Sequence, residues 1–257
     1  MRFSVLASGS SGNACYVETA QARILIDAGL SCRELISRLK LIEVDPETLD
    51  ALIITHEHLD HIKGAGPLSR LLDIPVYING STLRKGIRVL GNLSKPVTVR
   101  TGQTFVINGL AIETFTKCHD AADPMGILIA SEGVRLGLIT DLGRSTRLVE
   151  DRLSGCHALI LEFNHDERML EEGPYPLEVK RRIKGPDGHL SNQQAAELAT
   201  AVCDDKLDLV MLAHLSAQNN LPEKALGALS NALMRSGRVN TRILMSHQEY
   251  PAPVITL

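Results

Sequence analysis

Aromatic side chains are scarce in this sequence. Its 257 residues include no tryptophan, four phenylalanines and four tyrosines. Proteins that hold single-stranded nucleic acid by stacking use aromatic rings as platforms for successive bases. Such platforms are therefore sparse here, and Phe163 and Tyr175 are the rings that we expect to contribute.

Paired cysteines are missing as well. The five cysteines are an odd number without a CxxC pair, and they lie at positions 15, 32, 118, 156 and 203. This usage indicates reduced thiols in a cytosolic protein rather than a disulfide framework. The first ten residues, MRFSVLASGS, contain one arginine and a very short apolar run, which argues against a signal peptide. We therefore expect a cytoplasmic protein.

A long apolar run and a strong charge of one sign are both absent. No stretch approaches the roughly 20 apolar residues that cross a bilayer, so we expect no membrane association. The net charge of −3 neither indicates nor excludes a nucleic-acid partner. The length and the 44% hydrophobic fraction allow a substantial core, and no linker divides the chain. We therefore predict one domain over residues 1–257.

The apolar pattern predicts an α/β fold. Short runs rich in valine and isoleucine, bounded by glycine, serine or aspartate, indicate strands. Such runs include residues 2–8, 14–20, 22–29, 51–58, 157–164 and 207–216. Apolar residues at helical spacing indicate helices at 32–41, 61–73, 191–205 and 222–237. This order fits two sheets covered by helices, in four layers.

Polar side chains are concentrated in the sequence ITHEHLDH, residues 54–61. His56 and His58 are two residues apart, so in an extended segment they point to the same side and can hold one ion. Asp60 and His61 follow where the chain begins to turn, and they can face a second ion. A lone histidine at a strand end is usually structural, but several buried polar groups left unpaired would cost about 1–3 kcal/mol each. We therefore predict a site for zinc-type divalent ions, which favour imidazole and carboxylate ligands.

Three further polar residues each follow a predicted strand, namely His119, Asp141 and His214. Strand ends in an α/β sheet carry its active-site loops. Any one of these residues alone is more often structural than functional. Together with the histidine-rich segment they complete two sites and a bridge: His56, His58 and His119; Asp60, His61 and His214; and Asp141 between them.

The HxHxDH pattern, the later histidine, the aspartate after a strand and the final histidine resemble the metallo-β-lactamase superfamily. The resemblance covers nearly the whole chain. It implies a four-layered αβ/βα sandwich of two mixed β-sheets flanked by helices, with two divalent metal ions, Zn²⁺ or Mn²⁺, between the sheets. It also implies that Asp27, in ILIDAG, orients a ligand histidine. A true lactamase typically has cysteine at the position of Asp141, and carboxylate ligands suit phosphoryl chemistry.

The loop ASGSSGNA, residues 7–14, combines small residues and hydroxyl groups after the first predicted strand. Its glycines allow close backbone approach, and Ser8, Ser10, Ser11 and Asn13 offer hydrogen-bond donors. Such a turn can cradle a phosphate through its amides. The alternative is a hairpin turn that binds no ligand.

The segment KRRIKGPDGHLSN, residues 180–192, offers a second phosphate-binding element. It places His189, Ser191 and Asn192 at the start of a predicted helix, whose N-terminal amides favour an anion. Four basic residues precede them and can follow a phosphate backbone, namely Lys180, Arg181, Arg182 and Lys184. Of these, we expect Arg181 and Arg182 to lie beside the pocket. The alternative is a solvated basic surface.

The segments ASGSSGN, HEHLDH, FNHDE, GHLSN and AHLSAQNN are similar to the YycJ/WalJ branch of the superfamily, which is related to RNase Z-like and PhnP-type phosphodiesterases. Members of that branch are understood to be DNA exonucleases that digest from the 5′ end and are linked to mismatch repair. The resemblance implies that His189 contacts the phosphate or acts as a general acid. Asp60 would be a ligand that also steers the attacking water, and Asn164 and His165 would line the pocket. We therefore predict a dinuclear metal-dependent phosphodiesterase, first of all a 5′-to-3′ DNA exonuclease acting in DNA repair.

Other activities stay open. A thioester hydrolase of the glyoxalase II type would need a glutathione-binding surface, for which the sequence has no signature. A hydrolase of a small phosphodiester and a non-catalytic, metal-dependent protein that binds DNA ends are also compatible with the ligand set. The oligomeric state is open too, with a homodimer as one option.

Overall fold

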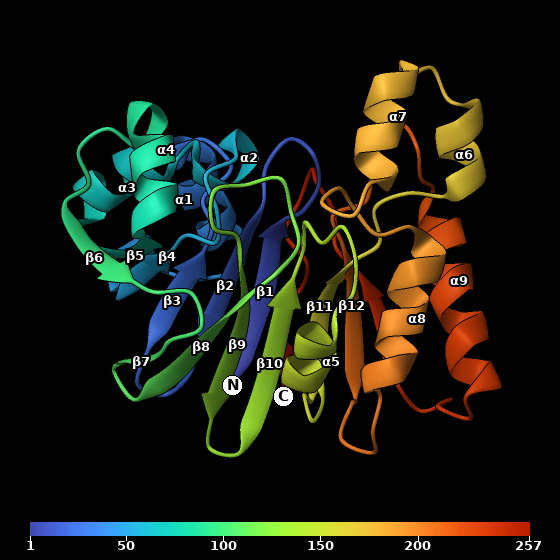
Figure 1. The fold of residues 1–257 in the computed structure, drawn as a ribbon. Helices are drawn as coiled ribbons and strands as arrows, with labels where there is room; N and C mark the ends of the chain where they lie inside the picture. Colours follow the sequence, from blue (N-terminus) through green and yellow to red (C-terminus); the bar gives the residue numbers. More distant parts are fainter.

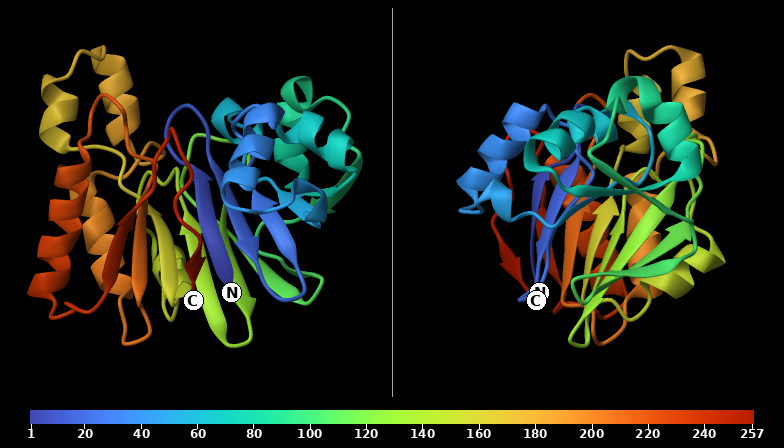
Figure 2. Two further views of the ribbon diagram at one scale, coloured as in Figure 1. Left: turned by 180° about the vertical axis from the view of Figure 1, so that it is seen from behind. Right: turned by 90° about the vertical axis from the view of Figure 1, so that its left-hand side faces the viewer.

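The computed structural model describes residues 1–257 and shows two seven-stranded sheets packed against each other, with helices on both outer faces (Figure 1). The first sheet has the strand order β14-β1-β2-β3-β4-β5-β6. Its strands are β1 (Arg2–Ala7), β2 (Ala14–Glu18), β3 (Arg23–Ile26), β4 (Ala51–Ile53), β5 (Pro75–Asn79), β6 (Lys95–Val99) and β14 (Ile255–Thr256). The pairing of β14 with β1 brings the two termini side by side (Figure 2).

The second sheet has the strand order β13-β12-β11-β10-β9-β8-β7. Its strands are β7 (Thr104–Ile107), β8 (Leu110–Thr116), β9 (Met125–Ser131), β10 (Val134–Ile139), β11 (Ala158–Glu162), β12 (Leu209–Ala213) and β13 (Arg242–Met245). Both sheets contain parallel and antiparallel pairs. The predicted sandwich of two mixed sheets is therefore confirmed.

Helices cover the outer face of each sheet. The first sheet carries α1 (Cys32–Leu41), the short 3₁₀ helix η1 (Pro46–Thr48), α2 (Leu59–Ile62), α3 (Ala65–Leu72) and α4 (Gly80–Leu90). The second carries α5 (Arg147–Leu153), α8 (Asn192–Val202) and α9 (Pro222–Arg235), while α6 (Glu167–Glu172) and α7 (Leu177–Lys184) project beyond the sheets (Figure 1). None of these helices has the length and apolar character of a membrane span.

Strands buried on both faces explain the four layers. In β12, Leu209 and Met211 join the apolar core between the sheets, while Val210 and Leu212 pack under the outer helices. A strand covered on both faces reads as a continuous apolar run rather than an alternating one. The run LVMLA has this composition, and all five of its residues are buried.

The strand directions place several chain ends at one edge of the sandwich. β3, β4 and β5 run parallel in the first sheet, as do β10, β11 and β12 in the second. Ligand sites of such sheets lie beyond the carboxyl ends of the strands. The loops after these strands meet at the upper edge in Figure 1.

The prediction of one helix over residues 61–73 was wrong, and two helices of the structure were not predicted. Residues 61–73 do not form one helix, because the chain breaks between α2 and α3 at Gly64, whose N–H donates to the Ala28 carbonyl. A Cβ on Gly64 would lie 2.3 Å from the Leu30 carbonyl oxygen, so this close approach requires glycine. The sequence pattern also did not indicate α6 and α7. No residue of α7 is buried, and three of its eight residues are apolar, which is a weak helical signal in the sequence.

Replacement of Arg38 by alanine should destabilise the fold by about 3 kcal/mol. The Arg38 side chain on α1 is 5% exposed and donates to the carbonyls of Leu6, Gln248 and Glu249, which its loss would leave unpaired. Urea denaturation measures the free energy of unfolding. Arg33→Ala on the exposed face of α1 is the matched control and should change it by less than about 0.5 kcal/mol. Equal effects of the two variants would contradict this role of Arg38.

Candidate metal centre

Three histidines form the first group of potential ligands. His56 and His58 follow β4, and His119 follows β8. One nitrogen from each ring lies within 4.8 Å of the others. The ring centroids of His56 and His58 are 4.7 Å apart, and that of His119 is 5.1 Å from His56. The structure thus brings together the first predicted set.

The second group contains Asp60, His61, Asp141 and His214. His61 Nε2 lies 3.2 Å from Asp141 Oδ2 and 3.5 Å from Asp60 Oδ2. His214 Nε2 lies 3.5 Å from Asp141 Oδ1. The other predicted set is therefore also assembled, from segments that are up to 154 residues apart in the chain (214 − 60).

Asp141 stands between the two groups. Its Oδ1 lies 3.8 Å from Nε2 of His119 in the first group and 3.5 Å from Nε2 of His214 in the second. Its side chain is 2% exposed. This is the position that the predicted bridging ligand requires.

The hydrogen-bond pattern of the histidines fits metal binding. His119 Nδ1 donates to the Gly188 carbonyl, His61 Nδ1 to Asp27 and His214 Nδ1 to Glu162. His56 Nδ1 donates to the Thr55 hydroxyl, which itself donates to Asp27. In each of these rings Nδ1 is used by the protein and Nε2 is left for the site, as in a metal-binding histidine.

Several buried polar atoms at the centre have no hydrogen-bond partner. They include His56 Nε2, His214 Nε2 and Asp141 Oδ2. Buried polar atoms are nearly always paired, and the binding of an ion is a standard reason for an exception. Imidazole nitrogens with carboxylate oxygens are suitable ligands for zinc and manganese. The donor set therefore fits divalent metal ions.

Asp27 supports two of these histidines. Its Oδ2 accepts from His61 Nδ1 at 2.7 Å and from the Thr55 hydroxyl at 2.7 Å, and its Oδ1 accepts from the Thr55 N–H at 2.8 Å. This geometry agrees with what the resemblance implied for Asp27, namely that it orients a ligand histidine. Asp27 has a φ of 59°, as Asp141 and His214 have φ of 55° and 56°. Non-glycine residues in this left-handed region are uncommon and tend to cluster at functional sites.

Sequence analysis did not find Glu162, the last residue of β11. The Glu162 side chain is fully buried, and Oε2 accepts from His214 Nδ1 at 3.1 Å, His189 Nδ1 at 3.2 Å and the Asp141 N–H at 2.5 Å. Burial raises the pKa of this carboxyl, but the neighbouring His189 and His214 outweigh burial and lower it to about 2. An acid in the apolar run ALILEF was the available signal, because a buried carboxylate must be paired.

The predicted phosphate loop divides into two parts. Ser10 lines the pocket over the metal groups, and Ser11 is exposed. Ser8 and Asn13 are instead buried and committed to the protein. The Ser8 hydroxyl accepts from the His214 N–H, and Asn13 Nδ2 donates to Asp60 Oδ2 at 3.1 Å. These two side chains hold candidate metal ligands in place rather than facing a phosphate.

The structure does not bear out the prediction that the side chains of Ser191 and Asn192, at the start of α8, bind a phosphate. Ser191 is the N-cap, as expected, but its hydroxyl accepts from the Gln194 N–H and donates to Glu167. The Asn192 amide pairs with Asn220. Both residues are buried with their side-chain polar atoms occupied, so neither side chain is free to bind an anion.

The pocket above the metal groups has a volume of about 280 Å³ and contains most of the other predicted residues. Asn164, Arg182 and His189 line it together with His58, Asp60, Asp141 and His214. Arg181 does not line it, and its side chain is solvent-exposed.

Two further expectations about this region were wrong. His165 is 1% exposed and lies behind the pocket, where burial lowers its pKa to about 4. Phe163 is fully buried in the core under α8, so it cannot stack on a base, whereas Tyr175 does line the pocket.

Known proteins similar to this chain share its fold and much of its sequence. The family described as the β-lactamase superfamily domain matches residues 22–214. Exodeoxyribonuclease YycJ from Bacillus anthracis is 38% identical over 239 residues, which cover 92% of this chain and 90% of the relative. Exodeoxyribonuclease WalJ from Streptococcus pneumoniae is 36% identical over 243 residues, 91% of this chain and 89% of the relative. The metallo-β-lactamase fold protein YhfI from Bacillus subtilis is structurally similar, with a TM-score of 0.75 at 14% identity and 98% coverage of both chains.

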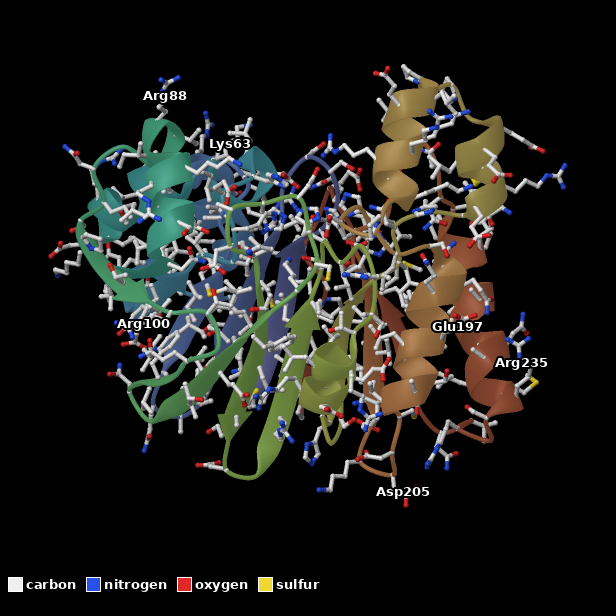
Figure 3. The ribbon with its side chains drawn as sticks, viewed as in Figure 1. Lys63, Arg88, Arg100, Glu197, Asp205 and Arg235 are labelled. Atoms are coloured by element: carbon white, nitrogen blue, oxygen red, sulfur yellow. The ribbon has the colours of Figure 1, made fainter.

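Asp27→Asn should weaken metal binding roughly 10- to 100-fold, the loss that follows removal of a group orienting a ligand histidine. The amide keeps the size of the side chain, but one carboxylate oxygen becomes an NH2 donor, so it cannot accept from His61 Nδ1, the Thr55 hydroxyl and the Thr55 N–H together. Competition with a chromophoric chelator measures the affinity for Zn²⁺ and Mn²⁺. Asp205→Asn, exposed at the opposite end of the molecule, is the control (Figure 3). An affinity equal to that of the control would refute this function of Asp27.

Proposed function

This chain belongs to the metallo-β-lactamase superfamily, in the branch of the exodeoxyribonucleases YycJ and WalJ, and from that premise we propose that it is a metal-dependent exodeoxyribonuclease. The observation that carries the proposal is the meeting of both groups of metal-binding residues with His189 around one pocket. A chain that only bound DNA ends would have no need of a histidine poised beside the metal groups. The donor set contains two carboxylates and five imidazoles, which suits Mn²⁺ as well as Zn²⁺.

The residues around the pocket divide the work of hydrolysis. Two divalent ions held by the two groups would supply positive charge for the phosphate and activate water. Asn13 and His61 hold the Asp60 side chain in a fixed orientation beside the two groups of candidate metal ligands. His189 directs Nδ1 at Glu162, which leaves Nε2 for the phosphate or for the departing oxygen.

Glu162 holds the ring of His189 in place. Its buried carboxylate lies 3.2 Å from Nδ1, so Nδ1 faces Glu162 and Nε2 is the nitrogen left for the substrate. From that position Nε2 can donate a proton to the leaving oxygen. Glu162 also accepts from His214 and the Asp141 N–H, so one side chain positions both the acid and the metal-binding residues.

Basic residues at the same end of the molecule support a polyanionic substrate. Figure 3 shows Lys63 and Arg88 at the end of the molecule where α7 projects. Arg84, Lys85 and Arg88 are exposed on α4, a helix without an acidic residue. Lysine and arginine side chains bind the phosphate backbone without regard to sequence, and that binding weakens as salt rises. The 5′ polarity of digestion and a function in DNA repair stay predictions from the resemblance.

The small volume of the pocket favours a second candidate, a hydrolase of a small phosphodiester. About 280 Å³ is at the low end for a ligand pocket and admits one nucleotide-sized group. A thioester substrate has no comparable support in the site.

Duplex DNA labelled at the 5′ or the 3′ end, with matched RNA, tests the proposed activity. Protein stripped of metal and reloaded with Mn²⁺ or Zn²⁺ should release the 5′ label first from DNA, and more slowly at high salt because phosphate contacts weaken. Metal-free protein should leave the DNA intact. If the protein hydrolyses bis-p-nitrophenyl phosphate but leaves DNA intact, the exonuclease proposal is refuted and the small-phosphodiester hydrolase is supported.

His189→Ala should lower kcat about 10²- to 10⁴-fold while metal content, measured by elemental analysis, stays at the wild-type value. Asp141→Ala should instead lose bound metal, because its carboxylate contacts both groups of ligands. His157→Gln, which changes a histidine remote from the pocket, is the control for loss of an imidazole. Full activity of His189→Ala on DNA would show that His189 has no part in the chemistry.

A further inference from the structure

The pocket over the metal groups has two unlike walls. One consists of the metal-binding residues and His189. The other consists of apolar and aromatic side chains from α7 and the turn before it, namely Tyr175, Val179 and Ile183. Figure 1 shows why the second wall exists, because α6 and α7 project as a hairpin beside the loops of the metal centre. A substrate phosphate at the metal groups would therefore extend its next chemical group toward an apolar surface.

The apolar residues of this wall are not part of the hydrophobic core. No residue of α7 is buried, and neither Val179 nor Ile183 belongs to an apolar cluster of the sandwich. Val179 and Ile183 are four residues apart, so they lie on one face of the helix together with Arg182. Half-exposed apolar side chains gathered at a polar pocket are typical of a binding surface.

Tyr175 differs from two other tyrosines of the chain. Tyr77 stacks on Phe105 and Tyr250 on His247, whereas the ring of Tyr175 stacks on no other ring. It is half-buried at the edge of the pocket. An aromatic ring without a stacking partner thus contributes to the surface of the pocket.

Arg182 adds a charge at a fixed place. Its Nε donates to Asp120 Oδ2 at 2.7 Å, and Asp120 directly follows the metal-binding residue His119. The Arg182 side chain is 65% exposed, so its terminal nitrogens can bind a phosphate while Nε holds the side chain in position.

The hairpin itself is braced by lysines. Lys180 Nζ donates to the Glu171 carbonyl at 2.6 Å, and Lys184 Nζ donates to the Glu171 carboxylate at 2.5 Å. Two of the four basic residues in this run therefore connect α7 to α6 and do not follow a phosphate backbone. Rigid support of this kind lets α7 act as a wall for a ligand.

We propose that this wall receives the unpaired base of the terminal nucleotide, which packs on Tyr175, Val179 and Ile183 while Arg182 binds a neighbouring phosphate. This inference rests on the proposed exonuclease function and adds that the pocket contacts the terminal base of the substrate. Every base has a flat face, so stacking on Tyr175 tolerates all sequences, as an exonuclease requires. A pocket of about 280 Å³ admits one nucleotide and not a base pair, so the end of a duplex must open before it is cut.

Two activated esters measure the contribution of the base without DNA. They are the p-nitrophenyl ester of thymidine 5′-monophosphate, which carries a base, and methyl p-nitrophenyl phosphate, which does not. For the metal-loaded wild-type protein, the base should lower KM roughly tenfold relative to the base-free ester, within the range expected for one stacked base. In Tyr175→Ala this KM ratio should fall toward one, and in Tyr175→Phe, which keeps the ring, it should stay near the wild-type value.

Leu177→Ala is the matched control on the same helix. Leu177 is 61% exposed and does not line the pocket, so its loss should leave the KM ratio unchanged. On labelled duplexes, a mismatched terminal pair should be digested faster than a matched one, since an unpaired base enters a pocket at lower cost.

A Tyr175→Ala protein that keeps the wild-type KM ratio would overturn the inference, as would equal digestion of matched and mismatched ends. Intact DNA with both esters cleaved would instead refute the exonuclease function. The ester ratio would still decide whether the wall binds a base.

Discussion

Buried charge between the two sheets is the constraint on which the site depends. Asp27, Asp141 and Glu162 are each 3% exposed or less, and a carboxylate in that environment is costly unless it is paired. The chain pairs them with imidazoles, so that His61 lies between Asp27 and Asp141, and His214 between Asp141 and Glu162. The atoms that stay unpaired point at the places where divalent ions fit.

This pairing ties the chemistry to the architecture. The contributing residues come from the ends of β3, β4, β8, β10, β11 and β12, which are anchored in strands with buried faces. A residue held in such a strand has little freedom to move, which preserves distances among side chains that are remote in the sequence. The uncommon backbone conformations of Asp27, Asp141 and His214 persist because rigid strands precede them.

The α6–α7 hairpin is attached to the molecule in a different way from the strands of the sandwich. It contributes nothing buried through α7 and is joined to the metal centre by the ion pair between Arg182 and Asp120. The sandwich and its paired charges hold the candidate metal ligands, while α7 lines the pocket with Val179, Arg182 and Ile183.

The sequence by itself determined the fold class and indicated the residues that folding brings together as two groups of candidate metal ligands. Strand ends can be located from apolar runs, and His56, His119, Asp141 and His214 each follow one closely. It did not reveal Glu162, because a carboxylate inside an apolar strand has no partner in the local sequence. The tertiary structure also decided that Ser8, Asn13, Ser191 and Asn192 serve the protein rather than a phosphate. Their partners, among them His214, Asp60 and Asn220, are brought to them only by folding. Local sequence determines which side chains are present near a strand end, but hydrogen bonds between distant segments determine which of them remain free to bind a substrate.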